Sequence, residues 1–171
     1  MKHYLIYGFK ASGKTTYARE LAEDLGLKHI DLDQEILRIY DKSNISDFYN
    51  SLPNEFREIE YKIFKQTLKK IIYQSHSKSL SKDKASDIYN NRNILPVVFS
   101  VGGSTLLNKN IDIKELKKHF NFNLIDTDFK IIYKRIQKQK TIYKKYSYKE
   151  LKEIYSEKML IFKKWETLWN Y

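Results

Sequence analysis

The chain has 171 residues, no cysteine and a formal net charge of +11, with 42% hydrophobic residues. Such a length and composition predict one domain with a real hydrophobic core, and the lack of cysteine excludes disulfides and thiolate metal sites. Because no apolar run approaches the roughly 20 residues of a membrane span and no signal peptide opens the sequence, we expect a cytoplasmic protein with no membrane partner.

The positive charge has two interpretations, a nucleic-acid-binding face or an ordinary solvated surface. The excess is almost entirely lysine, and the lysines are spread along helical stretches rather than clustered. This distribution favours the solvated surface over nucleic acid as a partner. The four histidines show no metal-ligand spacing, so any bound metal must be held by oxygen ligands.

Taken in chain order, the apolar patterns predict strands that alternate with helices. The expected elements are a strand at residues 3–7, a helix from Gly13 to Leu25, a strand at 27–32, short helices at 33–40 and 46–51, a long helix from Pro53, strands at 94–101 and 120–125, a helix capped by Asp128, and a last helix at 147–169. Gly26 is well placed to end the first helix, and Ser147 with Glu150 forms a capping box for the last. The polar segment 75–93 is unusually long for a connection and is expected to be a mobile surface insertion. Strands separated by helices predict a parallel sheet covered on both faces, with ligands at the carboxyl ends of the strands.

The strongest chemical signal is a complete GxxxxGK[ST] pattern, Gly8-Phe9-Lys10-Ala11-Ser12-Gly13-Lys14-Thr15, between an expected strand and an expected helix. In a P-loop of this kind, backbone N–H groups wrap a polyphosphate, the lysine reaches the β- and γ-oxygens and the hydroxyl binds Mg²⁺. We therefore predict ATP and Mg²⁺ as cofactors, with Lys14 as a catalytic residue. The expected nucleotide-binding residues of the loop are Gly8, Ala11, Ser12, Gly13, Lys14, Thr15 and Thr16.

Asp31 and Asp33 stand at the exit of the second expected strand, where alternation would point both carboxylates to the same side. One of them would hold Mg²⁺, and the other would orient the attacking hydroxyl or accept its proton. Alternatively, Asp33 only caps the following helix.

Arg57 and Glu60 lie three positions apart on one helix face beside Phe56, so a guanidinium, a carboxylate and an aromatic wall can share a pocket. The alternative is an ordinary ion pair within the helix. Gly102 and Gly103 follow the third expected strand, where they either permit a ligand to approach the backbone closely or form only a tight turn.

These features, in this order and nearly with this spacing, resemble the motifs of the shikimate kinases. The P-loop, "DLDQEI", "EFREIE" and "VGGS" stand where that family shows its P-loop, DxD, FRxxE and GGG motifs. The resemblance implies an α/β fold of the nucleoside-monophosphate-kinase type, a three-layer P-loop kinase fold with a central parallel sheet of about four strands. It also divides the single kinase domain, 1–171, into a core (1–32 and 94–135), an acceptor-binding subdomain (33–74), the insertion (75–93), a lid (136–148) and the C-terminal helix (147–169).

The resemblance implies roles for individual residues. Thr15 and Asp31 would serve Mg²⁺, Asp33 would act on the acceptor hydroxyl, and Arg135 would lie over the adenine. Lys158 stands where the family places a carboxylate-binding arginine. The residues expected to bind the acceptor, a small anionic metabolite, are Asp33, Phe56, Arg57, Glu60, Gly102, Gly103 and Lys158, and those expected to be catalytic are Lys14, Asp33 and Arg57.

The sequence also departs from the family pattern. Val101 replaces the first glycine of GGG, and the lid reads "QKQKTIYKK", so that only lysines such as Lys138 and Lys140 supply positive charge there. The sequence ends at Tyr171, before the family's fifth strand and final helix. Three hypotheses therefore remain open: a shikimate kinase-like enzyme, a P-loop kinase for another small metabolite, and a degenerate nucleotide-binding regulatory module. A nucleic-acid kinase finds no support in interleaved aromatic and basic residues. Both a monomer and a dimer remain open.

Overall fold

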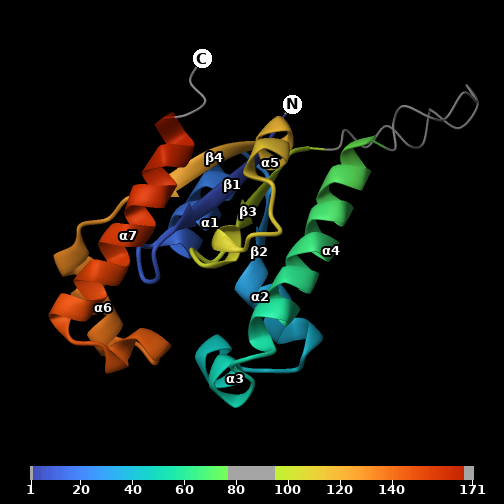
Figure 1. Ribbon diagram of the computed structural model, residues 1–171. Coiled ribbons are helices and arrows are strands. Elements are labelled where there is room, and N and C mark those ends of the chain that lie inside the picture. Colours follow the sequence, from blue (N-terminus) through green and yellow to red (C-terminus); the bar gives the residue numbers. More distant parts are fainter. Residues whose placement is uncertain (1, 77–94, 168–171) are drawn as a thin grey trace, which may run out of the picture.

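The computed structural model describes residues 2–76 and 95–167, which fold around one four-stranded parallel sheet (Figure 1). Its strands are β1 (His3–Gly8), β2 (Lys28–Asp31), β3 (Val97–Ser100) and β4 (Phe120–Ile125), in the order β2-β3-β1-β4. The helices are α1 (Lys14–Asp24), α2 (Leu32–Ile39), α3 (Ile45–Ser51), α4 (Phe56–His76), α5 (Ile113–His119), α6 (Phe129–Lys138) and α7 (Tyr148–Thr167), with short 3₁₀ helices η2 (Thr105–Leu107) and η3 (Ile142–Lys145).

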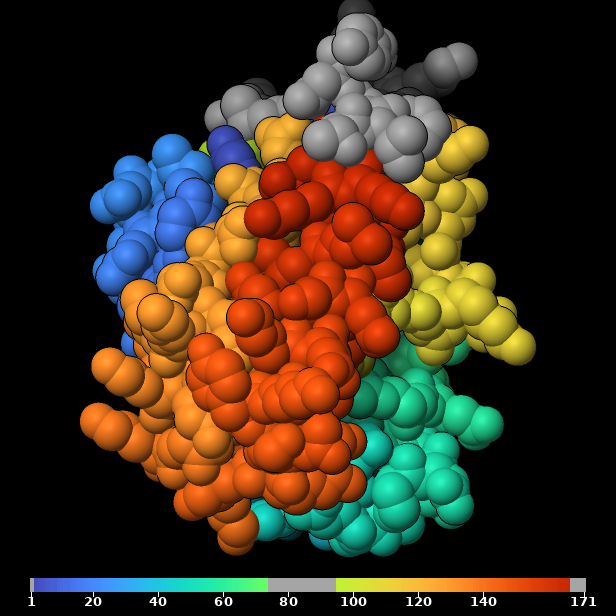
Figure 2. All heavy atoms as spheres, turned by 60° about the vertical axis from the view of Figure 1, so that its left-hand side comes forward, coloured from blue at the N-terminus to red at the C-terminus, as the bar shows by residue number. Residues whose placement is uncertain are grey.

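Strand alternation divides the core between the two faces of the sheet. Ile6 and Val98 pack on one face against Ala18 and Ala22 of α1. The opposite faces of β1 and β3 belong to a larger cluster, to which α4 and α7 contribute buried aliphatic and aromatic side chains. Figure 1 shows α4 and α7 flanking the strands, and Figure 2 shows α7 covering one side of the molecule with α6 beside it. The predicted three-layer architecture is therefore confirmed.

Local capping signals place several helix ends correctly. The Asp128 side chain accepts a hydrogen bond from the Lys130 N–H at 2.8 Å, and Ser147 and Glu150 form the predicted capping box. Gly26 follows α1 with φ +63, a left-handed conformation that suits glycine.

Other boundaries differ from expectation. β2 ends at Asp31, so Asp33 belongs to the first turn of α2 and not to a strand exit. The long helix begins at Phe56 rather than at Pro53, because the preceding residues form a turn in which the Phe56 N–H bonds to the Leu52 carbonyl. β3 begins only at Val97, after Pro96, which has no N–H to donate to a strand ladder.

Three elements of the described part were not predicted, η2, α5 and η3. Of the predicted insertion, residues 77–93 lie outside the described residues. No helix within residues 2–76 and 95–167 is long and apolar enough to cross a membrane.

The parallel sheet brings three loops to one edge. The P-loop follows β1, Asp31 ends β2, and Gly102 follows β3. Since β3 lies between β2 and β1, these three segments are neighbours in space.

Candidate active site

The P-loop runs from the end of β1 into the N-terminus of α1 and forms the floor of a cavity of about 690 Å³. Ala11 and Gly13 have positive φ values of 63 and 98, so the loop curls with its N–H groups toward the start of the helix. Six of the predicted loop residues line the cavity, from Ala11 to Thr16. Gly8 does not, because it packs against the backbone of Ile125. The buried Ser12 Oγ has no hydrogen-bond partner in the described chain, which leaves a polar atom available to a ligand.

Lys14 lies at the centre of this loop. Its Nζ donates to the Phe9 carbonyl at 2.7 Å. Desolvation lowers the pKa of Lys14 to about 8, although the nearby carboxylate of Asp33 acts in the opposite direction. A bound anion would stabilise the charged ammonium and offset the cost of its desolvation, so the site is well suited to a polyphosphate.

Asp31 is held by three neutral donors. Its Oδ2 accepts from Thr15 Oγ1 and from Ser100 Oγ, each at 2.9 Å, and its Oδ1 accepts from the Gln34 N–H at 3.2 Å. The N-cap of α2 is therefore Asp31. The interpretation of Asp33 as that cap was wrong, because α2 begins at Leu32, one residue earlier than expected, and its N-cap is Asp31.

Sequence reasoning missed the support of Asp31 by Ser100 and His29. His29 Nε2 lies 3.0 Å from Ser100 Oγ. Because the single hydroxyl hydrogen of Ser100 goes to Asp31, the histidine nitrogen is the donor in this pair. No sequence signal joins these residues, since they come together only through the pairing of β2 with β3.

Asp33 lines the cavity from the first turn of α2. Burial raises the pKa of its carboxyl, and the positive charge of Lys10 partly opposes this increase. The Cβ of an alanine at Gly102 would lie 4.0 Å from Asp33 Oδ1, so this carboxylate is close to the loop after β3. A carboxylate with a raised pKa in a cavity is suited to accept a proton.

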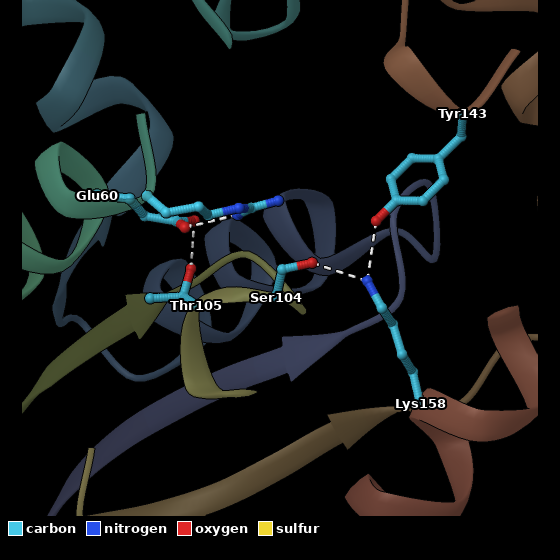
Figure 3. Close-up of polar contacts among 6 residues, drawn as sticks. Glu60, Ser104, Thr105, Tyr143 and Lys158 are labelled. Atoms are coloured by element: carbon cyan, nitrogen blue, oxygen red, sulfur yellow. Dashed lines mark hydrogen bonds and ion pairs between the residues drawn. The ribbon is translucent and has the colours of Figure 1, made fainter. Parts of the chain in front are cut away.

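Arg57 and Glu60 of α4 also line the cavity. Arg57 Nη1 donates to Glu60 Oε2 at 2.6 Å, and Glu60 Oε1 accepts from Thr105 Oγ1 at 2.7 Å (Figure 3). The guanidinium also lies 5.4 Å from the ring of Tyr49 and 5.9 Å from that of Phe56. Both interpretations of Arg57 and Glu60 apply, because these residues form an ion pair within the helix and also line the cavity.

A close backbone contact requires glycine at position 103. A Cβ at this position would lie 2.4 Å from the Gly8 carbonyl oxygen, which no side chain tolerates. The loop after β3 therefore packs directly on the P-loop. Gly102 and Gly103 both line the cavity beside Ser104.

Lys158 projects from α7 toward the same loop, as Figure 3 shows. Its Nζ donates to Ser104 Oγ at 2.7 Å and to the Tyr143 hydroxyl at 2.9 Å. Burial would raise the pKa of Tyr143, but the charge and hydrogen bond of Lys158 outweigh it, and the net shift is downward. Phe9 of the P-loop lies under the ammonium, 5.6 Å from it. Ser104 and Tyr143 are cavity residues that the sequence did not reveal.

Beside the P-loop, Arg135 is exposed and its Nη1 donates to the Ala11 carbonyl at 3.1 Å. It lines the cavity together with the P-loop. Its predicted place over an adenine stays a prediction.

The predicted lid contributes uncharged side chains to the cavity. Gln139, Thr141, Ile142 and Tyr143 line it, whereas none of the lid lysines does. Lys140 instead pairs with Asp47 at 2.8 Å, which links the predicted lid to α3. The sequence offered only lysines such as Lys138 and Lys140 as positive charges in the lid, and neither of them lines the cavity.

The described part of the chain contains no group of three or more His, Cys, Asp or Glu side chains arranged to hold a metal. Thr15 Oγ1 and Asp31 Oδ2 are adjoining oxygens beside the P-loop, 2.9 Å apart. This pair fits a magnesium ion that takes its other ligands from phosphate and water.

Comparison with known proteins gives one family. A family model described as shikimate kinase matches residues 10–95. Shikimate kinase of Macrococcus caseolyticus is 33% identical over 134 residues, which cover 78% of this chain and 64% of that protein. The pentafunctional AROM polypeptide of Kluyveromyces lactis is 40% identical over 70 residues, which cover 40% of this chain and 4% of that protein. The chain thus spans less than two thirds of either relative.

Solved structures give the same fold. The crystal structure of shikimate kinase from Aquifex aeolicus superposes with a TM-score of 0.64 at 22% identity. The match covers 96% of this chain and 83% of that one.

Proposed function

The chain belongs to the shikimate kinase family, and we propose that it is a kinase that transfers the γ-phosphoryl group of ATP to a hydroxyl of a small anionic metabolite. One observation carries this proposal. The P-loop with Lys14 shares a single cavity with Asp33 and with the paired Arg57 and Glu60. A phosphate donor and an anionic acceptor can therefore meet there.

The donor side is the P-loop. Its N–H groups and Lys14 would bind the β- and γ-phosphates, and Arg135 would cover the base. Mg²⁺, held by Thr15 and Asp31, would neutralise charge on these phosphates when bound. The phosphate charge would stabilise the charged form of Lys14, which burial disfavours.

The acceptor side is built from α4, the loop after β3 and α7. Asp33 would accept the proton of the attacking hydroxyl, and burial favours this role because it raises the pKa of the carboxyl. Arg57 and Lys158 would bind the acceptor's anionic group, with Phe56, Glu60, Gly102 and Gly103 shaping the pocket. We assign the acceptor to the segment 33–74 and the covering lid to 136–148.

The identity of the acceptor is a separate proposal. Shikimate is the first candidate because of the family. A different small anion is the second, because the position of the family's carboxylate-binding arginine is held by Lys158, whose ammonium already bonds to Ser104 and Tyr143.

The test is an ADP-release assay with ATP and Mg²⁺ on a panel that includes shikimate, quinate, gluconate and nucleoside monophosphates. We expect turnover on at least one of these acceptors, and we expect Lys14→Ala to abolish it while the variant keeps its fold by circular dichroism. If the protein binds ATP tightly and turns over none of them, it is a nucleotide-binding module instead. If Lys14→Ala retains turnover at saturating ATP, the assignment of the P-loop is wrong.

A further inference from the structure

Among the described residues, five cationic side chains line the cavity, and four of them bond to other groups of the protein. Lys14 donates to the Phe9 carbonyl, and Arg135 donates to the Ala11 carbonyl. Arg57 is paired with Glu60. Lys158 donates to Ser104 and Tyr143. Lys10 is the fifth. Within residues 2–76 and 95–167 its ammonium makes no hydrogen bond or ion pair.

The position of Lys10 places this available charge at the reacting groups. It is the third residue of the P-loop, between the buried Phe9 and the left-handed Ala11, and it is half-buried at the cavity wall. Lys10, Lys14 and Asp33 line the same cavity. The ammonium of Lys10 therefore shares this space with both the proposed proton acceptor and the phosphate-binding lysine.

A cation at the position of Lys10 is important because the lid places no lysine in the cavity. Transfer of a phosphoryl group requires a cation near the oxygens that carry charge in transit. No lid lysine lines the cavity, and Lys140 is paired with Asp47 on the outside. A lysine can supply this charge as a point charge on a flexible stem.

We propose that Lys10 is a catalytic residue that places its ammonium on the phosphoryl group in transit, so that the P-loop supplies the charge that the lid lacks. This inference rests on the proposed kinase function. In the step, a bond forms between the acceptor oxygen and the γ-phosphorus while the bond from that phosphorus to the bridging oxygen breaks. The electron pair stays on the β-phosphate, the hydroxyl proton goes to Asp33, and Lys10 keeps its protons throughout.

The test compares Lys10→Gln, Lys10→Arg and, as a matched control on the lid, Lys138→Gln. Lys138 is exposed at the end of α6 and does not line the cavity. The readout is the binding of ADP and Mg²⁺ with and without aluminium fluoride, which imitates the phosphoryl group in transit. The turnover number on the best acceptor is measured in parallel.

We expect Lys10→Gln to weaken fluoroaluminate-dependent binding and turnover by roughly 10 to 100-fold, while ADP alone binds within about threefold of the unmodified protein. Lys10→Arg should recover most of the loss, and Lys138→Gln should change neither quantity. Unchanged fluoroaluminate binding in Lys10→Gln would overturn the inference, and so would an equal loss in Lys138→Gln, which would return the role to the lid. If the unmodified protein turns over no acceptor, the proposed function fails, but the fluoroaluminate measurement still decides the role of Lys10.

Discussion

At the end of β2, two carboxylates only two positions apart lie in different surroundings. Asp31 is held by the hydroxyls of Thr15 and Ser100 and by a backbone N–H, whereas Asp33 is buried at the cavity with a raised pKa. An amide can replace the capping oxygen at the first position, but it cannot accept a proton at the second. The same substitution should therefore have different effects at these two residues.

Asp33→Asn should reduce turnover by about 10² to 10⁴-fold with nearly unchanged ATP affinity, because it removes a proton acceptor and keeps the shape of the side chain. Asp31→Asn should instead weaken the binding of Mg²⁺, seen as a higher Mg²⁺ concentration at half-maximal rate. Steady-state kinetics over a range of ATP and Mg²⁺ concentrations separates the two. Equal kinetic profiles for both variants would contradict the division of roles.

The raised pKa of Asp33 also predicts a pH-dependent stability. A folded-state pKa above the unfolded value means that the charged carboxylate destabilises the fold as the pH rises through the folded pKa. Asp33→Asn should therefore melt at a higher temperature than the unmodified protein at neutral pH. The gain should shrink as the pH falls, which thermal melts at pH 5 and pH 7.5 will measure.

Lys14 makes a prediction about proton uptake. Its pKa of about 8 leaves it largely neutral at pH 8.5, and a bound polyphosphate favours the charged form. Nucleotide binding at pH 8.5 should therefore take up on the order of three quarters of a proton from solution. Calorimetry in two buffers of different ionisation enthalpy measures this uptake, which Lys14→Met should abolish. Binding of equal enthalpy in both buffers would show that Lys14 is already charged.

At the scale of the elements, much of the fold could be predicted because its signals are local. The P-loop pattern, the glycine after α1 and the capping box before α7 each involve residues within a few positions of one another. By contrast, α5 has only seven residues and a single buried apolar side chain, Leu116, so no helical period can develop. Asp33 was placed at a strand exit because nothing in "DLDQEI" marks where β2 stops and α2 begins.

The site could be predicted only in part, because some of its residues lie in local motifs and others are brought together only by tertiary packing. The sequence locates the P-loop, Asp33, Arg57 and Glu60, all of which lie in recognisable motifs, and the structure brings them into one cavity. It does not locate Tyr143 or Ser104, because their positions depend on how the lid and α7 pack. The direction of the lid lysines also depends on tertiary structure, since a lysine faces solvent or substrate according to its neighbours.

The contact between the P-loop and the loop after β3 makes a prediction about Gly103. Gly103→Ala should lower the free energy of unfolding by about 1 to 3 kcal/mol and also weaken ADP binding, because the new Cβ lies 2.4 Å from the Gly8 carbonyl. Gly26→Ala is the matched control. That position is strained by its φ of +63 but has nothing within 4 Å of a Cβ, so this variant should lose about 1 kcal/mol and keep ADP affinity. Denaturant unfolding and ADP titration on both variants check this, and normal ADP binding by Gly103→Ala would show that the two loops are not coupled.

At the scale of the whole molecule, the part of the cavity that we assign to the acceptor is assembled from segments that are far apart in sequence. Arg57 comes from α4, Ser104 from the loop after β3, Tyr143 from the lid and Lys158 from α7. The Lys140 to Asp47 pair adds a direct link from the lid to α3. We therefore expect acceptor binding to depend on the relative placement of all these parts, and α7 contributes Lys158, a charge that differs from the family pattern.

The last prediction concerns that charge. A carboxylate that enters the pocket must compete with Ser104 and Tyr143 for the ammonium of Lys158, and an ammonium lacks the planar fork with which an arginine holds both oxygens. If one charge-assisted bond of about 1.5 to 3 kcal/mol is weakened, shikimate should bind roughly 10 to 100-fold more weakly than to a site with two arginines.

We therefore expect weak or absent turnover of shikimate by the unmodified protein and a gain in Lys158→Arg. The gain should appear mainly in KM, because the carboxylate is remote from the reacting hydroxyl and is bound alike in the ground and transition states. Lys163→Arg is the matched control, since Lys163 lies on the same helix and pairs with Asp126 outside the cavity. Tight use of shikimate by the unmodified protein would mean that Lys158 already completes the site. A Lys158→Arg variant that loses activity on shikimate and gains none on the other acceptors would mean that the natural acceptor is not a carboxylate of this shape.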